Sequence, residues 1–512
     1  MFHARLSISR DDVVAPVSPR LFGSFVEHMG RSVYTGIYEP GHPTADANGF
    51  RQDVLDLVRE LGPSLIRYPG GNFVSGFRWE DSVGPRADRP VRLDVAWHSR
   101  EANEVGLHEF ADWADTAGVE IMQAVNLGTR GIMAAADLLE YSNHPGGTAL
   151  SDQRQANGRT EPFGIQVWCL GNEMDGPWQI GHKTADEYGR LAAETARVMK
   201  WVDPTIELVV AGSSNDQMPT FGSWERTVLE HTAELVDHIS LHAYYEEKPG
   251  DLGSFLASGV GLDRFIGSVA EIIYEVTVAQ GLDKSIGISV DEWNVWDQTR
   301  FNEVDKEPLF TGDWNDHPRL IEDEYNVSDA VVVGSLLISL LRNSDRVSMA
   351  NLAQLVNVIA PIRSEPNGPA WRQTTFFPFA LTAAAARGAV LAATVHSDSY
   401  DTALHGTVDL LDATVTATDD EVVLFLVNRS ADAPLTVDVD LAGAPVASVL
   451  DAQSLFAPEG GDRFATNALE HMDTVRPVPL TEVTLAEDGT GATVVLPALS
   501  WSIVRLAARS AA

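Results

Sequence analysis

Two glutamates, Glu173 and Glu292, stand where apolar runs of the chain give way to polar residues. Glu173 ends the run "IQVWCLGNE", and Glu292 lies near the end of "IGISVDEWN". A pair of carboxylates suits glycoside hydrolysis, because one can protonate the leaving oxygen while the other attacks the anomeric carbon. If the two carboxyl groups stand about 5 Å apart, the reaction passes through a covalent intermediate and retains the configuration. We therefore predict that Glu173 and Glu292 form a catalytic pair.

Polar residues near the two glutamates support this prediction. A single carboxylate at the end of a strand more often caps a helix or meets solvent, so the flanking groups matter. Asn172 would direct its amide to the sugar hydroxyl next to the reacting carbon, where hydrogen bonds strengthen in the transition state. In the run "HISLHAYY", Tyr244 would hold one carboxylate and His242 the other.

Eight apolar runs that alternate with helical patterns would position these residues. They are "LFGSFVE" (21–27), "SLIRYPG" (64–70), "IMQAVNLG" (121–128), "IQVWCLGNE" (165–173), "IELVVAGSS" (206–214), "HISLHAYY" (238–245), "IGISVDEWN" (286–294) and "MANLAQL" (349–355). Strands that alternate with helices form parallel βαβ units, and eight such units close a (β/α)8 TIM barrel. The functional residues of such a barrel lie at the carboxyl ends of its strands, so Glu173 and Glu292 would meet at one mouth.

The pattern changes after about residue 388. Segments such as "TVDLLDATVTATDDEVVLFLVNRS" alternate apolar and polar residues with a period of two, which predicts a C-terminal antiparallel β-sandwich, jelly-roll-like in form. The first strand-like stretch, "ARLSISR", has no helix after it and is expected to join this sandwich. We predict a catalytic barrel at 15–387 and a sandwich made of 1–14 plus 388–512. The segment 297–325 lacks clear periodicity, and a loop of that length is usually functional.

Charge and cysteine content exclude several classes of protein. Asp and Glu number 73 against 36 Lys and Arg, a formal charge of -37, which disfavours binding to nucleic acid or to a membrane surface. No apolar run reaches the ~20 residues of a membrane span, and the start lacks the pattern of a secretory signal. The single cysteine excludes an intramolecular disulfide. These features favour the cytoplasm.

Motifs for other chemistries are missing from the sequence. Neither a GxGxxG nor a GxxxxGK[ST] motif occurs, so nothing supports dinucleotide or P-loop phosphate binding. No cysteine and histidine cluster has zinc spacing, and the GxSxG elbow of serine hydrolases is absent. The predicted reaction requires neither a metal nor a cofactor.

Six longer stretches of the sequence are distinctive: "CLGNEMDGPWQIGHK", "RYPGGNFVSGFRWEDSVGP", "ANEVGLHEF", "SLHAYY", "SVDEWNVW" and "NLAQLVNVIAPI". Together they resemble glycoside hydrolase family 51, the α-L-arabinofuranosidases. The resemblance implies that Glu173 is the acid/base and Glu292 the nucleophile. It also implies a sugar-binding set around them, with His242 beside the acid/base: Glu27, Asn72, Asn172, Tyr244, Gln354, and the aromatic walls Trp97 and Trp296. Members of the family are often hexamers, so a homo-oligomer is expected.

The function expected from these features is that of a retaining, exo-acting α-L-arabinofuranosidase. Its substrates would be terminal arabinofuranosyl residues of arabino-oligosaccharides, arabinan or arabinoxylan fragments. Two alternatives stay open: an endo-acting β-glucanase or xyloglucanase of the same family, and an inactive barrel that only binds sugars. An open cleft in place of a closed pocket would favour the first, and loss of either glutamate would have marked the second.

Overall fold

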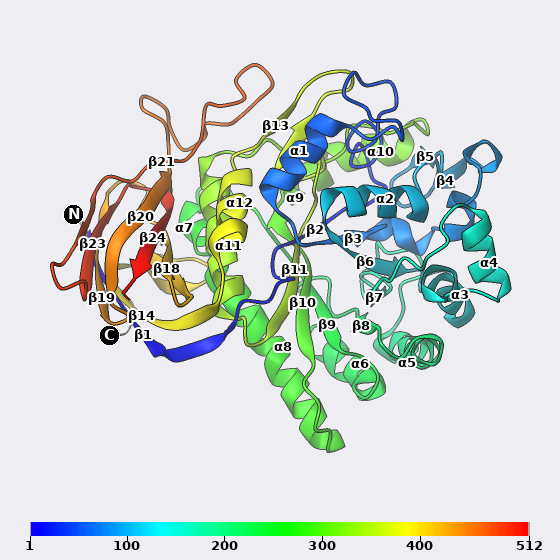
Figure 1. Cartoon of the computed structure of the whole chain (residues 1–512), viewed down its shortest axis with the longest axis horizontal. Helices are drawn as coiled ribbons and strands as arrows, with labels where there is room; N and C mark the ends of the chain where they lie inside the picture. The colour runs from blue at the N-terminus through cyan, green and yellow to red at the C-terminus, as the bar shows by residue number, and fades with distance from the viewer. Residues whose placement is uncertain (1, 510–512) are drawn as a thin grey trace.

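The protein, studied as a computed structural model that describes residues 2–509, contains a closed barrel of eight parallel strands (Figure 1). These strands are β2 (Gly23–Phe25), β3 (Leu65–Tyr68), β6 (Glu120–Val125), β7 (Val167–Leu170), β8 (Glu207–Val210), β9 (His238–Tyr245), β10 (Gly287–Val295) and β11 (Val347–Leu352). Each lies within or overlaps one of the eight predicted runs. The prediction of a (β/α)8 barrel is therefore confirmed.

Helices follow each barrel strand and form the outer ring. They are α1 (Gln52–Leu61), α2 (Leu107–Ala117), α3 (Ile132–Asn143) with α4 (Ala149–Ala156), α5 (Ala185–Val202), α6 (Ser223–Thr232), α7 (Leu252–Leu256) with α8 (Ser258–Gln280), α11 (Val327–Arg342) and α12 (Phe376–Ala385). Local signals fix several of their ends. Helix α5 begins at a capping box in which Thr184 and Glu187 satisfy each other's backbone N–H groups, and α1 ends at Gly62 in the left-handed region.

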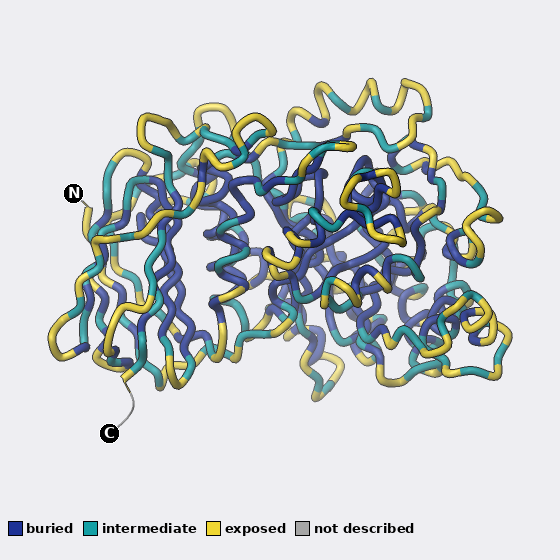
Figure 2. The backbone as a smooth tube through the Cα atoms, turned by 45° about the horizontal axis from the view of Figure 1, so that its top comes forward, coloured by how far each residue is buried: buried dark blue, intermediate teal, exposed yellow. Residues whose placement is uncertain are grey.

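Burial explains why the barrel strands appear in the sequence as mostly apolar runs. Strands β3 and β7 are buried on both faces, as parallel strands covered by helices must be. Figure 2 shows the backbone buried through much of the interior of the molecule. Helix α11 is buried over almost its whole length, because it lies between the barrel and the C-terminal sheet. Its apolar surface on all sides follows from that position.

The C-terminal part forms one ten-stranded sheet. In chain order its strands are β1 (Phe2–Pro16), β14 (Ala389–Ser397), β17 (Leu411–Ala417), β18 (Glu421–Asn428), β19 (Leu435–Gly443), β20 (Val446–Leu455), β21 (Val478–Pro479), β22 (Val483–Leu485), β23 (Gly491–Leu496) and β24 (Ser500–Ala508). Strands on both sides of β1 in this sheet contribute side chains to one apolar core, as the predicted sandwich requires. The first strand lies between β14 and β19, and its parallel pairing with β19 is an exception in an otherwise antiparallel sheet.

The segment 297–325 differs from the irregular loop expected from its sequence. It contains three short helical pieces, α9 (Gln298–Arg300), the π-helical turn η4 (Phe301–Asp305) and α10 (Lys306–Thr311). No periodicity marks them, because most of their side chains are exposed and few carry the apolar spacing of a packed helix. We call residues 298–311 the covering segment.

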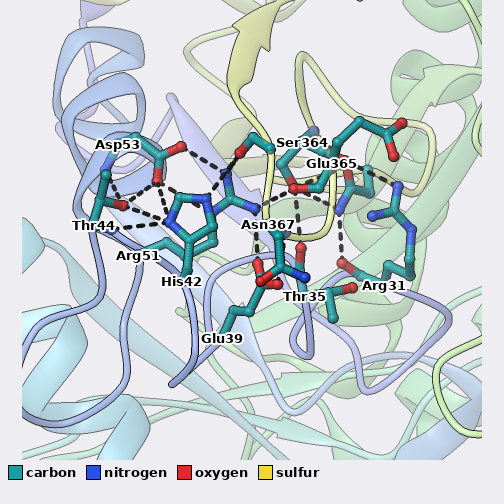
Figure 3. A network of polar contacts seen from close by, with 12 residues as sticks. Arg31, Thr35, Glu39, His42, Thr44, Arg51, Asp53, Ser364, Glu365 and Asn367 are labelled. Carbon is teal, nitrogen blue, oxygen red and sulfur yellow. Dashed lines mark hydrogen bonds and ion pairs between the residues drawn. The ribbon is translucent and has the colours of Figure 1, made fainter.

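A buried polar network joins the loop after β2 to the loop after β11 (Figure 3). Arg51 has no exposed surface and forms ion pairs with Glu39 and Asp53. The same guanidinium donates to the backbone carbonyls of Glu365 and Gly368, at the tip of the hairpin formed by β12 (Ile362–Ser364) and β13 (Ala370–Arg372). Every nitrogen of this side chain is hydrogen-bonded, so the two loops are held against each other.

Replacing Arg51 by methionine is expected to destabilise the protein by about 3–5 kcal/mol, the cost of breaking a buried ion pair and leaving its partners unpaired. The change would appear as a lower thermal denaturation midpoint. Arg197→Met on the surface of α5 is the matched control and should change stability by no more than about 0.5 kcal/mol. Equal midpoints for the two variants would show that Arg51 does not hold the loops together.

Candidate active site

The carboxyl ends of the barrel strands surround one cavity of about 320 Å³. Loops after six of the eight strands contribute to its wall, and β9 contributes through Tyr244 in the strand itself. The covering segment adds Gln298, Phe301, Asn302, Lys306 and Phe310. Eight of the ten predicted site residues line it: Glu27, Asn72, Trp97, Glu173, Tyr244, Glu292, Trp296 and Gln354. The other two, Asn172 and His242, are buried and contact residues that do line the cavity.

Glu292, on β10, is fixed at both of its oxygens. Arg67 on β3 donates from Nη1 to Oε1 at 2.7 Å, and the hydroxyl of Tyr244 on β9 donates to Oε2 at 2.7 Å. The guanidinium of Arg67 also donates to Oδ1 of Asn172 at 2.6 Å. Three strands thus hold one buried carboxylate in a single orientation.

Glu173 follows β7 in a turn that brings its side chain into the cavity. Its φ of 42° lies in the left-handed region, which non-glycine residues seldom adopt and which recurs at functional sites. His242 contacts Oε1 through Nδ1 at 2.9 Å, and Trp178 donates from Nε1 to Oε2 at 2.5 Å. A Cβ at Gly176 would lie 2.6 Å from the Trp178 ring, so glycine is needed there for the indole to reach this carboxylate.

The two carboxylates lie close enough to act on one atom. One oxygen of Glu173, one of Glu292 and a ring nitrogen of His242 all lie within 4.8 Å of one another. Burial alone would raise the pKa of Glu292, but His242, Arg67 and Tyr244 outweigh it and lower that pKa below its ordinary value. Burial lowers the pKa of His242, yet the two carboxylates outweigh burial and raise it. Glu292 is thereby kept ionised.

A third carboxyl group, that of Glu27, also lines the cavity. Its Oε1 accepts the backbone N–H of Phe73 at 2.8 Å and Nε1 of Trp97 at 2.7 Å. Gln354 donates to Oε2 at 3.4 Å. Burial raises the pKa of Glu27 to about 8, so this side chain is protonated at neutral pH and can donate a hydrogen bond. A Cβ at Gly70 would lie 2.5 Å from Cβ of Glu27, which explains the glycine next to it.

The raised pKa of Glu27 predicts how stability depends on pH. An unfolded glutamate ionises near pH 4.5, whereas the folded one keeps its proton to about pH 8. Between these values the folded state binds more protons, so the stability contributed by this group is highest at low pH and falls as the pH rises, by up to about 1.4 kcal/mol per pH unit.

Glu27→Gln cannot titrate, so its thermal midpoint should fall less between about pH 5 and pH 8 than that of the wild type. Glu271→Gln on the exposed face of α8 serves as the control for removing a glutamate. Parallel pH dependences for Glu27→Gln and the wild type would refute the raised pKa.

Two residues that shape the site, Arg67 and Trp178, were not predicted from the sequence. Arg67 lies inside the apolar run "SLIRYPG", where a charged residue in a buried strand was the available clue. Trp178 stands in the same motif as Glu173, but only the turn geometry shows their hydrogen bond.

The amide of Asn172 contacts Asn72 and Gln179 at 3.4 and 3.3 Å, so it orders the wall of the cavity.

Glu173, His242 and Glu292 also have the spacing of a possible metal site. The oxygens of the two glutamates are already engaged by four side chains, those of Arg67, Trp178, His242 and Tyr244. The guanidinium of Arg67 stands 2.7 Å from Glu292. A fixed positive charge at that distance opposes a second cation. The arrangement therefore suits proton transfer and nucleophilic attack better than metal binding.

Comparison with known proteins agrees with the geometry of the site. Two family models match: the α-L-arabinofuranosidase 1 domain over residues 57–257 and the α-L-arabinofuranosidase C-terminal domain over residues 291–500. The chain is 55% identical to the intracellular exo-α-(1→5)-L-arabinofuranosidase of Streptomyces lividans, over 98% of this chain and 75% of that protein. It is 53% identical to the exo-α-(1→6)-L-arabinofuranosidase of Bifidobacterium longum, over 98% and 97%.

A solved structure shows the same fold over its full length. The family 51 α-L-arabinofuranosidase from Bifidobacterium longum superposes with a TM-score of 0.93 at 48% identity, covering 99% of this chain and 100% of that one. The identities and coverage of these relatives leave one assignment: the chain belongs to glycoside hydrolase family 51, the α-L-arabinofuranosidases.

Proposed function

We propose that the protein is a retaining, exo-acting α-L-arabinofuranosidase that removes terminal arabinofuranosyl residues. The observation that carries the proposal is the pair of carboxylates, Glu173 and Glu292, which line one cavity with oxygens within 4.8 Å of each other. Retaining glycosidases hold their carboxyl groups about 5–5.5 Å apart, whereas inverting enzymes leave room for a water molecule between them. The relatives of about 50% identity are named as exo-acting enzymes, which does not favour the endo-acting alternative.

The groups of the site support a double displacement. Glu292, ionised and aligned by Arg67 and Tyr244, attacks the anomeric carbon while Glu173 gives its proton to the departing oxygen. Water then enters where the leaving group was. Glu173 takes a proton from that water, whose oxygen attacks the anomeric carbon and releases Glu292. Two inversions at one carbon leave the product with the configuration of the substrate.

The remaining residues would hold the sugar. A protonated Glu27 and the amides of Asn72 and Gln354 present hydrogen-bonding groups to the hydroxyls of an arabinofuranosyl ring. The rings of Trp97 and Trp296 offer apolar surface to its C–H faces. Asn172 and His242 would act on the sugar through the groups they orient.

Two relatives of nearly equal identity are named for different linkages, (1→5) and (1→6), so the linkage cleaved here requires its own experiment. The test is a panel of arabino-oligosaccharides of defined linkage, with products followed by NMR from the first seconds of reaction. We expect α-L-arabinose to form first and to equilibrate with the β anomer later. Initial release of the β anomer would overturn the retaining mechanism, and absence of any arabinose would overturn the function.

The relatives also inform the setting of the protein. Several are named intracellular enzymes, and among residues 2–509 no helix has the length and apolarity of a membrane span. A cytoplasmic enzyme acting on imported arabino-oligosaccharides fits both observations. A hexamer stays a prediction, which size-exclusion chromatography with light scattering would test.

A further inference from the structure

Two segments from distant parts of the chain meet over the cavity. One is the hairpin formed by β4 (Arg92–Asp94) and β5 (Ser99–Glu101), which carries the wall residue Trp97. The other is the covering segment with the residues that follow it, up to Asp316. Strands β3 and β10, after which these segments come, are not neighbours: β2 and β11 lie between them in the barrel. The contact between the two segments therefore passes over the loops that follow β2 and β11.

The contact between these segments is specific. The ring of His98 stacks on Trp314 with centroids 3.8 Å apart and approaches Phe310 at 6.1 Å. His98 also bonds the carbonyl of Gly312 through Nε2 at 3.0 Å. The backbone N–H of Arg100 donates to the carbonyl of Asn315. We call these contacts, together with the ion pair between Arg100 and Asp316, the clasp.

The covering segment depends on its ends for its position. At its start, Thr299 is held by the carboxylate of Glu246 through its backbone N–H and its hydroxyl, both at 2.9 Å. Its helical pieces are short, and helices of three to six residues are not stable without tertiary contacts. Phe301 packs towards Trp296 and Trp97. The clasp is the anchor at the other end.

We call the β4–β5 hairpin and the covering segment, joined by the clasp, the roof, and this roof leaves the cavity open on one side. Glu27 and Gln354 follow β2 and β11, the two strands between β3 and β10, whereas Trp178, Ser214 and Asn215 follow β7 and β8 on the opposite side of the barrel mouth. Trp178 is 46% exposed. Glu173, which would protonate the leaving oxygen, also follows β7. A leaving group can therefore depart past Trp178 and Asn215, but a chain attached to the far side of the bound sugar would meet the roof.

We propose that the clasp confines this enzyme to the ends of chains, and that His98 and Trp314 are specificity-determining residues. This inference rests on the proposed function and adds the structural cause of its exo action. An arabinofuranosyl residue in the interior of a polymer carries sugars on two sides, and only one of them has an exit. With the clasp opened, the second exit would lie between the hairpin and the covering segment.

The test compares Trp314→Ala with the wild type on linear α-1,5-arabinan, with products separated by chain length. The wild type should release arabinose alone. The variant should also release arabinobiose and longer oligomers, and amide hydrogen exchange should become faster across residues 298–311. Trp314→Phe keeps a stacking ring and should restore the wild-type pattern. Trp201→Ala, at an exposed position on α5, is the matched control.

Each outcome decides the proposal. Release of arabinose alone by Trp314→Ala would overturn it, as would unchanged exchange in 298–311. If Trp314→Ala does not fold, as judged by its thermal midpoint, the double variant Arg100→Ala/Asp316→Ala opens the clasp at exposed side chains and takes its place. Wild-type hydrolysis of 4-nitrophenyl α-L-arabinofuranoside is measured in parallel. Its failure would refute the proposed function, whereas a negative result with intact hydrolysis would refute only the role of the clasp.

Discussion

Replacement of Glu292 by alanine is expected to abolish the release of 4-nitrophenol from its α-L-arabinofuranoside, with kcat falling by a factor of about 10⁴ or more, as for other enzymes that lose a nucleophile. 4-Nitrophenol leaves without help from an acid. Its good leaving ability does not compensate for the loss of Glu292, because what the variant lacks is the nucleophile. Arg67 and Tyr244 hold the carboxylate in place, and in the variant they face an empty site with no atom to attack the sugar.

Azide offers a control for this prediction, because it is small enough to occupy the space of the missing carboxylate. It would attack from the side that Glu292 occupies and yield the β-arabinofuranosyl azide, with inverted configuration. Glu271→Ala on the surface of α8 should keep full activity. Undiminished turnover by Glu292→Ala would defeat the assignment of this residue as the nucleophile.

The barrel could be predicted from the sequence because its physics is local and repeated. Each parallel strand is buried on both faces, so it appears as a short apolar run, and the run "VWCL" coincides with β7. Residues at the carboxyl ends of such strands must share one mouth. That rule alone brought together Glu173 and Glu292, which are far apart in the chain.

Other features depend on contacts that no local pattern encodes. The covering segment is held by single contacts such as Glu246 with Thr299 and His98 with Trp314, so its sequence shows no period. The positive charge of Arg67 is buried only because Asp291 and Glu292 on β10 pair with it, while Asn172 after β7 accepts a hydrogen bond from it. The direction taken by the amide of Asn172, towards Asn72 and Gln179, likewise follows from the packing of three loops.

Replacement of Glu173 by alanine is expected to have an effect that depends on the leaving group. With oligosaccharides or methyl arabinofuranoside, whose leaving oxygens need a proton, kcat/KM should fall by about 10²–10⁴, the usual contribution of a general acid. With 2,4-dinitrophenyl arabinofuranoside the first step needs little acid, so kcat/KM should fall far less. Equal losses for the two classes of substrate would contradict the role of Glu173.

The second step tests the same residue in its other role. Without Glu173 no base activates the incoming water, so the glycosyl-enzyme on Glu292 should accumulate and give a burst of dinitrophenol. Azide needs no base, and here it would displace Glu292 from the face that the leaving group vacated, giving the α azide with retained configuration. The β azide from Glu292→Ala and the α azide from Glu173→Ala would place the two carboxylates on opposite faces of one sugar carbon. A site with only one working carboxylate could not produce both.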